Sequence, residues 1–164
     1  MTSTTNPDEF AQNVEAFFKN MINPDYKGWD ADIHNVHARF ESATPGPPPR
    51  ATFLLTVAPE LCNGLGNLHG GCATTIIDNL SSTLLLGGSR PGFYSLGGVS
   101  RNLTLTYLRP VPEGTEIRIV CEVVQTGRRL ALLRGEIRKA DDNTLCVVAS
   151  HEKANTDDPE SAKL

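Results

Sequence analysis

Residues 63–82, with the sequence NGLGNLHGGCATTIIDNLSS, constrain the fold of this 164-residue chain more than any other stretch. A Gly70-Gly71 pair stands directly before a long and mainly apolar run. The apolar side chains of that run recur at helical spacing and form one narrow stripe, made of Ala73, Ile76, Ile77, Leu80 and Leu84. We therefore predict a central helix over 70–86, with this stripe turned toward the core.

The start of this helix is suited to bind an oxygen atom that carries negative charge. Glycine has no Cβ, so a ligand can approach the backbone at Gly70 and Gly71 closely. The first N–H groups of a helix have no intrahelical acceptor, and they lie at the positive end of the helix dipole. A polarised carbonyl oxygen would be stabilised there, as in an oxyanion hole.

Asp78 is the candidate base of such a site. It lies two and a half turns into the predicted helix, and we expect its carboxylate to be buried among Ile76, Ile77 and Leu80. Nine residues separate it from His69, which is about 900° of helical rotation and places the two on opposite sides of the helix axis. A site that uses both residues therefore favours a two-fold dimer, in which each chain supplies one of them.

The rest of the chain predicts an α+β fold, with an antiparallel sheet around the central helix. Asn6-Pro7-Asp8-Glu9 has the form of a capping box with proline at the first helical position, and Asn23-Pro24 ends the amphipathic helix that follows. The TPGPPPR loop at 44–50 and the glycine-rich linker at 87–98 interrupt regular structure. Strands are expected near 35–42, 51–58, 98–108, 115–126, 129–140 and 144–153.

Composition excludes several classes of protein. The net charge is −4 and basic residues are not clustered, which argues against nucleic acid as a partner. No apolar stretch approaches the roughly 20 residues of a membrane span. His34 and His37 would point to opposite faces of an extended segment, so we interpret them as structural and not as metal ligands. The cysteines show no CxxC pairing and are expected to be free thiols, at Cys62, Cys72, Cys121 and Cys146.

Several of these residues also carry a family resemblance. Asn63, the LHGG run at 68–71, Asp78-Asn79, Ser100 and the TYLRP run at 106–110 resemble the hotdog-fold acyl-CoA thioesterases of the phenylacetate-degradation (PaaI-like) type. The resemblance extends over about 35–155. It implies a hotdog thioesterase domain over 35–153, preceded by a helical segment at 1–34 and followed by an exposed tail at 154–164.

The resemblance also implies roles for single residues in hydrolysis of acyl-CoA to a free acid and CoA, without a cofactor or a metal. Asn63 and the Gly70 N–H would polarise the thioester carbonyl. Asp78 from the other chain of a homodimer, or of a dimer of dimers, would act as general base or nucleophile, and Ser100 would place the water. His69 would position the carbonyl or the departing thiolate.

The CoA phosphates would have arginine partners. Arg109, Arg128 and Arg129 are the candidate contacts, although arginines at hairpin turns are commonly just solvated.

Other chemistries stay open at this point. Cys72 lies close to His69 and could be a thiol nucleophile activated by imidazole. A Ser-His-Asp triad is disfavoured, because the chain has no G-x-S-x-G elbow. A non-catalytic acyl-CoA sensor on the same fold and a hotdog enoyl-CoA hydratase are the alternative functions. The hydratase would need an aspartate and a histidine close together on one helical turn, and no such pair follows His69.

The last three residues, Ala162-Lys163-Leu164, differ by one substitution from the S-K-L peroxisomal address. The polar segment 155–164 should be exposed enough for an import receptor to bind. We therefore expect the protein in the peroxisomal matrix, with the cytoplasm as the alternative.

A fluorescent protein fused to residues 155–164 tests this expectation. It should become punctate and overlap a peroxisomal marker. Diffuse fluorescence that does not change when Leu164 is deleted would contradict the prediction.

Overall fold

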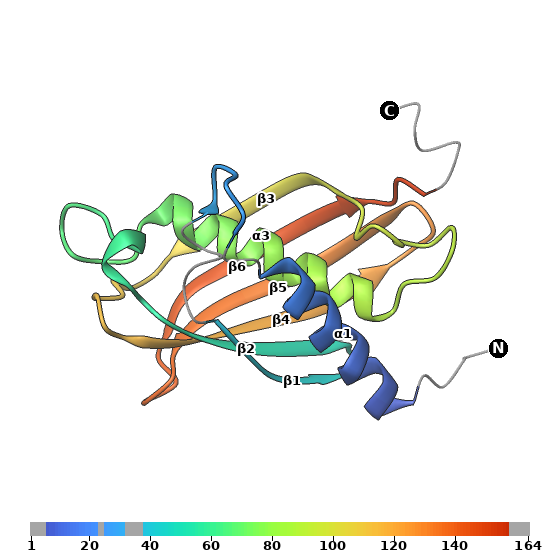
Figure 1. Ribbon diagram of the computed structural model, residues 1–164, viewed down its shortest axis with the longest axis horizontal. Coiled ribbons are helices and arrows are strands. Elements are labelled where there is room, and N and C mark those ends of the chain that lie inside the picture. Colours follow the sequence, from blue (N-terminus) through green and yellow to red (C-terminus); the bar gives the residue numbers. More distant parts are fainter. Residues whose placement is uncertain (1–5, 23–24, 32–37, 158–164) are drawn as a thin grey trace.

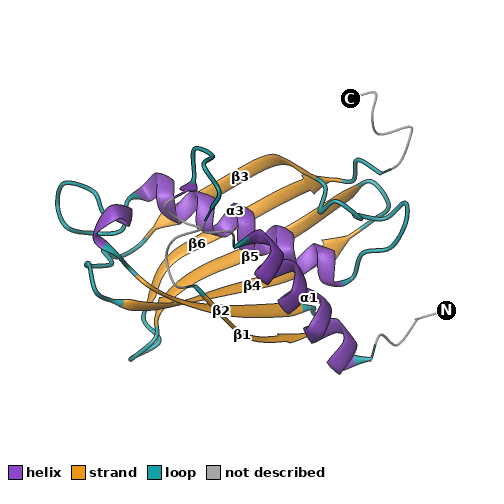
Figure 2. Ribbon diagram, viewed as in Figure 1, coloured by secondary structure: helices purple, strands orange, loops and turns teal. Residues whose placement is uncertain are grey.

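The computed structural model describes residues 6–22, 25–31 and 38–157. One antiparallel sheet of six strands curves around helix α3 (Gly70–Gly87), and helix α1 (Pro7–Met21) lies beside α3 (Figure 1). Both helices cover the same face of the sheet (Figure 2). The strands, in chain order, are β1 Arg39–Thr44, β2 Arg50–Thr56, β3 Val99–Tyr107, β4 Glu116–Thr126, β5 Leu130–Lys139 and β6 Leu145–Ala154. They are arranged in the order β1-β2-β4-β5-β6-β3, which makes β3 an edge strand.

The predicted α+β fold is confirmed, and most element boundaries agree within two residues. The first strand is the exception at its end, because β1 runs from Arg39 to Thr44 where 35–42 was expected, and residues 35–37 lie outside the described part of the chain. Gly46 has a φ of 90° in the loop that follows, and Thr44 pairs with Arg50 across it, so the strand extends further toward the turn. His34 and His37 lie outside the described residues.

The apolar stripe of α3 is the centre of the core. Its five predicted members are all buried, and inward-facing residues of the sheet such as Phe53, Ile119 and Leu133 are also buried. Helix α1 adds Phe10, Val14 and Phe18 from its own buried face. Asn6 caps α1 by accepting a hydrogen bond from the Asp8 N–H at 3.1 Å. Within the described residues, neither helix is long and apolar enough to cross a bilayer.

Gly135 on β5 sets how closely α3 lies to the sheet. A Cβ at this position would be 2.8 Å from Cδ1 and 2.9 Å from Cγ2 of Ile77. Both distances are shorter than real Cβ contacts, so any larger residue must push the helix or force Ile77 out of its rotamer.

We expect Gly135→Ala to lower the free energy of unfolding by about 1–3 kcal/mol, the usual cost of overpacking a core. Urea unfolding monitored by circular dichroism measures the change. Gly64→Ala is the matched control, because a Cβ at Gly64 meets no atom within 4 Å. Equal stability of the two variants would show that Gly135 does not limit the packing of α3.

Candidate active site

The loop before α3 holds Asn63 in a fixed orientation. The Asn63 N–H donates to the Asn67 carbonyl at 2.7 Å, and Oδ1 of Asn63 accepts from the backbone N–H groups of Leu65 at 2.9 Å and Asn67 at 3.3 Å. Since the loop occupies the side-chain oxygen, the Nδ2 amide is the part of Asn63 that can donate to a ligand.

Gly70 begins α3 beside the end of β3. The Tyr107 hydroxyl donates to the Gly70 carbonyl at 2.8 Å and lies 3.1 Å from Oγ1 of Thr74, which donates to the same carbonyl. A Cβ on Gly70 would be 3.2 Å from the tyrosine ring, so the close contact favours glycine. Within the described part of the chain, the Gly70 N–H has no hydrogen-bond acceptor. It therefore stays available to a ligand.

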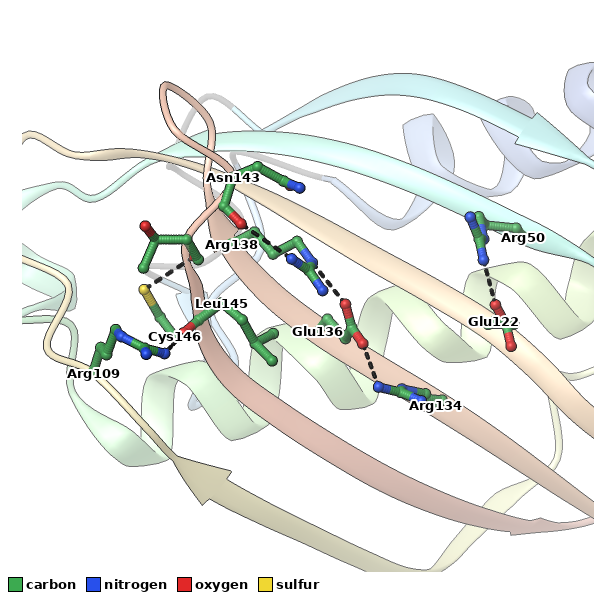
Figure 3. Close-up of polar contacts among 10 residues, drawn as sticks. Arg50, Arg109, Glu122, Arg134, Glu136, Arg138, Asn143, Leu145 and Cys146 are labelled. Carbon is green, nitrogen blue, oxygen red and sulfur yellow. Dashed lines mark hydrogen bonds and ion pairs between the residues drawn. The ribbon is translucent and has the colours of Figure 1, made fainter.

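Asn63 and Gly70 line the same cavity, of about 370 Å³, together with Tyr107 and Arg109. Arg109 donates from Nη1 to the Leu145 carbonyl at 2.7 Å, which fixes its guanidinium at this end of the sheet (Figure 3). The predicted carbonyl-polarising pair and one predicted phosphate contact thus come together.

His69 lies on the other side of the helix start. It is the N-cap of α3, and its Nδ1 accepts a hydrogen bond from the Gly71 N–H at 3.0 Å. The neutral imidazole then carries its proton on Nε2, which can donate to a ligand. His69 and Gly71 line a second cavity, of about 570 Å³, which Cys72 also lines. The two glycines of the pair therefore open onto two different cavities.

Asp78 forms the centre of a polar cluster further along α3. The Ser100 hydroxyl donates to Oδ1 of Asp78 at 2.6 Å, and Nε2 of His151 lies 3.1 Å from the same oxygen and 2.9 Å from the Ser100 hydroxyl. Nδ1 of His151 lies 2.7 Å from the hydroxyl of Ser81. Since Ser100 donates to Asp78, its oxygen accepts from His151, which places the imidazole proton on Nε2.

This arrangement brings a serine, a histidine and an aspartate into contact, although the sequence disfavours a triad. The connections differ from those of a triad, in which aspartate binds Nδ1 of the histidine and the histidine accepts the serine proton. Here Ser100 and Asp78 both contact Nε2, and Ser100 gives its proton to Asp78. No aspartate and histidine lie close together on one helical turn after His69, and the histidine neighbour of Asp78 is instead His151, which reaches it from β6.

A buried lysine completes the cluster. Lys153 is only 3% exposed, and its Nζ donates at 2.6 Å to the hydroxyl of Ser82, which in turn donates to the Asp78 carbonyl. Burial lowers the pKa of Lys153, and the charge of Asp78 opposes that effect.

The pKa of the Asp78 carboxyl lies below its usual value despite partial burial. The main cause is its hydrogen bond with His151, and the hydrogen bond from Ser100 adds to the effect. Asp78 is therefore a carboxylate at neutral pH.

The Asp78 side chain is 39% exposed, so the prediction of a buried carboxylate is wrong for the single chain. Its neighbours Ile76, Ile77 and Leu80 face the sheet, whereas Asp78 faces the edge strand β3 through Ser100. Eight residues of helix separate Asp78 from Gly70, which is a rise of about 12 Å. Neither cavity at the helix start includes Asp78.

The other predicted arginines lie elsewhere. Arg128 and Arg129 precede β5, and their backbone carbonyls accept hydrogen bonds from Asn155, just beyond the end of β6. Arg109 binds the start of β6, and ten residues of strand span about 33 Å. One chain therefore does not gather the three arginines at one site.

The outer face of the sheet carries a third cavity, of about 400 Å³. Its arginines are paired with glutamates: Arg50 with Glu122, and both Arg134 and Arg138 with Glu136 (Figure 3). Because each of these arginines already binds a carboxylate, this face is a weaker candidate for binding an anion than the helix start.

Sequence reasoning missed three residues of the site. His151 and Lys153 occupy the same face of β6 as the buried Val147 and Ala149, so strand alternation could have placed both beneath α3. Tyr107 stands within the TYLRP run but was not assigned a role of its own.

Comparisons with known proteins identify the family of the chain. The family model of the Thioesterase superfamily matches residues 65–146. Acyl-coenzyme A thioesterase 13 of Homo sapiens is 31% identical over 112 residues, which cover 68% of this chain and 75% of that protein. The crystal structure of thioesterase superfamily member 2 from Mus musculus superposes with a TM-score of 0.72 at 26% identity, over 88% of this chain and 96% of that one.

The PaaI protein of E. coli, from the phenylacetic acid degradation operon, has the same fold, with a TM-score of 0.68 at 17% identity over 92% of this chain and 96% of that one. The chain therefore belongs to the thioesterase superfamily. It is a PaaI-like hotdog protein and a thioester hydrolase.

The lowered pKa of Asp78 predicts how stability depends on pH. A carboxyl whose pKa is lower in the folded state contributes stability above its unfolded pKa, and this contribution is lost as the pH falls through the folded pKa. The free energy of unfolding of the wild type should therefore exceed that of Asp78→Asn most clearly above pH of about 4. Urea unfolding of both proteins from neutral to acid pH measures the difference, and a difference that does not shrink in acid would contradict the assignment.

Proposed function

We propose that the protein hydrolyses acyl-CoA thioesters at sites shared between two chains. The names of its acyl-coenzyme A thioesterase relatives support the substrate class. The observation that carries the proposal is the distribution of groups along α3. Asn63 and Gly70 occupy one end, and the Asp78 carboxylate with Ser100 and His151 lies about 12 Å further along.

The edge strand β3 supports a pairing that would close this gap. Ser100, near one end of β3, holds Asp78, and Tyr107, at the other end, holds Gly70. Among the described residues β3 pairs with β6 alone, and Val99 and Tyr107 are about half exposed. If two β3 strands pair antiparallel around a two-fold axis between residues 103 and 104, Ser100 of one chain lies opposite Tyr107 of the other. Asp78 of each chain then approaches Gly70 of the other.

The reaction at such a site follows from the groups present. Nδ2 of Asn63 and the Gly70 N–H donate to the thioester carbonyl oxygen and stabilise the negative charge that develops on it. A water molecule held by Ser100 attacks the carbonyl carbon and gives its proton to Asp78. The tetrahedral intermediate collapses, the carbon–sulfur bond breaks, and the CoA thiolate takes up the proton that Asp78 received from the water, which restores the carboxylate. Nε2–H of His69 donates a hydrogen bond that positions the carbonyl or the departing thiolate. Direct attack by Asp78 would instead form an acyl anhydride that water hydrolyses.

The same pairing would gather the basic residues. Arg128 and Arg129 lie near the Ser100 end of β3, since Val99 and Leu130 both pair with Ala154. Arg109 lies near the Tyr107 end. In an antiparallel dimer the two groups come from different chains toward one site, where they would contact the phosphates of CoA.

The enoyl-CoA hydratase is the alternative with structural support, because Asp78 and His151 do form a close pair. A hydratase consumes the enoyl group and releases no thiol, so a thiol-release assay separates it from the hydrolase. A sensor would bind acyl-CoA without either change.

Complementation between inactive variants tests the shared site. Asn63→Ala loses a carbonyl donor and Asp78→Asn loses the base, so each homodimer should hydrolyse acyl-CoA about 10²-fold or more slowly than wild type. Refolding the two variants together in equal amounts makes about half of the dimers mixed, and one of the two sites in each mixed dimer is intact. Thiol release should return to about a quarter of the wild-type rate.

If each site lay within one chain, every chain would still carry a lesion and no activity would return. Mixed dimers confirmed by mass spectrometry, without recovery of thiol release, would overturn the shared site. A wild type that releases no thiol from any acyl-CoA would overturn the proposed substrate class. Cys72→Ser is the control for the thiol alternative and should keep most of the activity.

A further inference from the structure

The two cavities at the start of α3 differ in charge. Among the described residues, the cavity beside Gly70 is lined by Arg109 and by no acidic residue. In the same part of the chain, the cavity beside Gly71 is lined by Asp30 and Glu60 and by neither lysine nor arginine. A thioester whose carbonyl is bound at Gly70 extends in two directions, so these cavities are candidates for its two arms.

Charge decides which arm enters which cavity. CoA carries phosphate groups, each with one to two negative charges at neutral pH, and these are repelled by carboxylates and attracted by arginine. The CoA arm therefore fits the cavity with Arg109, and the acyl arm is left with the cavity beside Gly71.

The second cavity also presents the apolar surface that an acyl group needs. Trp29 lines it and is 84% exposed, and Leu61, Cys62 and Cys72 contribute further apolar or weakly polar surface. A large aromatic side chain left outside the core is a typical surface for a ligand to cover. Its segment is fixed on α3, because Nδ2 of Asn79 donates to Oδ2 of Asp30 at 3.2 Å. The volume, about 570 Å³, is sufficient for a medium-length acyl chain.

We infer that the cavity lined by Trp29, Asp30, Glu60 and Cys72 binds the acyl group, and that it selects uncharged acyl groups over those that end in a carboxylate. The inference rests on the proposed acyl-CoA hydrolysis and assigns the selectivity of that same site. Trp29 packs against the acyl chain, and the two carboxylates repel a terminal carboxylate.

Binding can be measured without turnover, because Trp29 is the only tryptophan of the chain. Non-hydrolysable thioether analogues of hexanoyl-CoA and adipoyl-CoA have the same chain length and differ by a terminal carboxylate. The hexanoyl analogue should change the tryptophan fluorescence and bind more tightly, whereas free CoA should bind without changing it. A fluorescence change with free CoA equal to that with the hexanoyl analogue would overturn the inference.

Kinetics give the second measurement. Trp29→Ala should lower kcat/KM for hexanoyl-CoA about tenfold or more, as loss of apolar burial on an indole implies, and leave inhibition by free CoA unchanged. Glu60→Gln should raise kcat/KM for adipoyl-CoA about fivefold, because one like charge near the carboxylate is removed. The matched controls are Val124→Ala, an exposed apolar residue on the outer sheet face, and Glu9→Gln on α1, and both should behave as wild type.

The outcomes separate the two claims. Trp29→Ala and Glu60→Gln could both release thiol while the ratio of hexanoyl-CoA to adipoyl-CoA turnover stays as in wild type. That result would refute the assignment of the acyl group to this cavity, but it would not contradict the proposed hydrolysis. Weaker inhibition by free CoA in Trp29→Ala would show that the CoA arm occupies this cavity. Tight analogue binding seen by fluorescence without thiol release would instead contradict the proposed hydrolysis and support the cavity.

Discussion

Helix α3 touches the edge strand β3 at two places, and these contacts fix both parts of the candidate site. Tyr107 binds the carbonyl of Gly70 at the helix start, and Ser100 binds the carboxylate of Asp78 further along. The helix can lie close to the sheet because Gly135 leaves room for Ile77 beneath it. The same apolar packing that stabilises the domain therefore also holds α3 where both contacts with β3 can form.

The site is costly for a single chain to hold. His151 and Lys153 are buried beneath α3 at positions where the neighbouring inward residues of β6 are Val147 and Ala149. Burying a cation and an imidazole costs free energy unless they are hydrogen-bonded, and here Ser81, Ser82, Ser100 and Asp78 provide the partners. Apolar residues would fill these positions at lower cost. The buried polar cluster beside Asp78 is one of the observations that support the chemistry we propose for this carboxylate.

Much of the fold follows from local pattern. The stripe of α3 and the alternation of β4, β5 and β6 are each set by burial of one face, so their periods appear in the sequence. The end of β1 could not be placed as well, because pairing across the loop after Thr44 decides how far that strand extends. The helix pattern brought Gly70 and Asp78 into consideration and the family resemblance added Asn63 and Ser100, and the structure connects Asp78 and Ser100 directly. The contact between Asp78 and His151 joins residues 73 positions apart, which no local pattern encodes. The exposure of the Asp78 side chain could not be predicted from a local pattern either, because it depends on whether another chain covers the edge strand β3.

In the shared site that we propose, α3 of one chain supplies the carbonyl-binding groups and α3 of the other supplies the carboxylate. A crystal structure of the assembled enzyme with a thioether analogue of acyl-CoA bound tests this most directly. The decisive measurement is the distance from the Asp78 carboxylate to the analogue carbon that is bound at Gly70 and Asn63. We expect the nearer carboxylate to belong to the other chain and to lie within reach of one bridging water molecule. A nearer carboxylate from the same chain as Gly70 would contradict it.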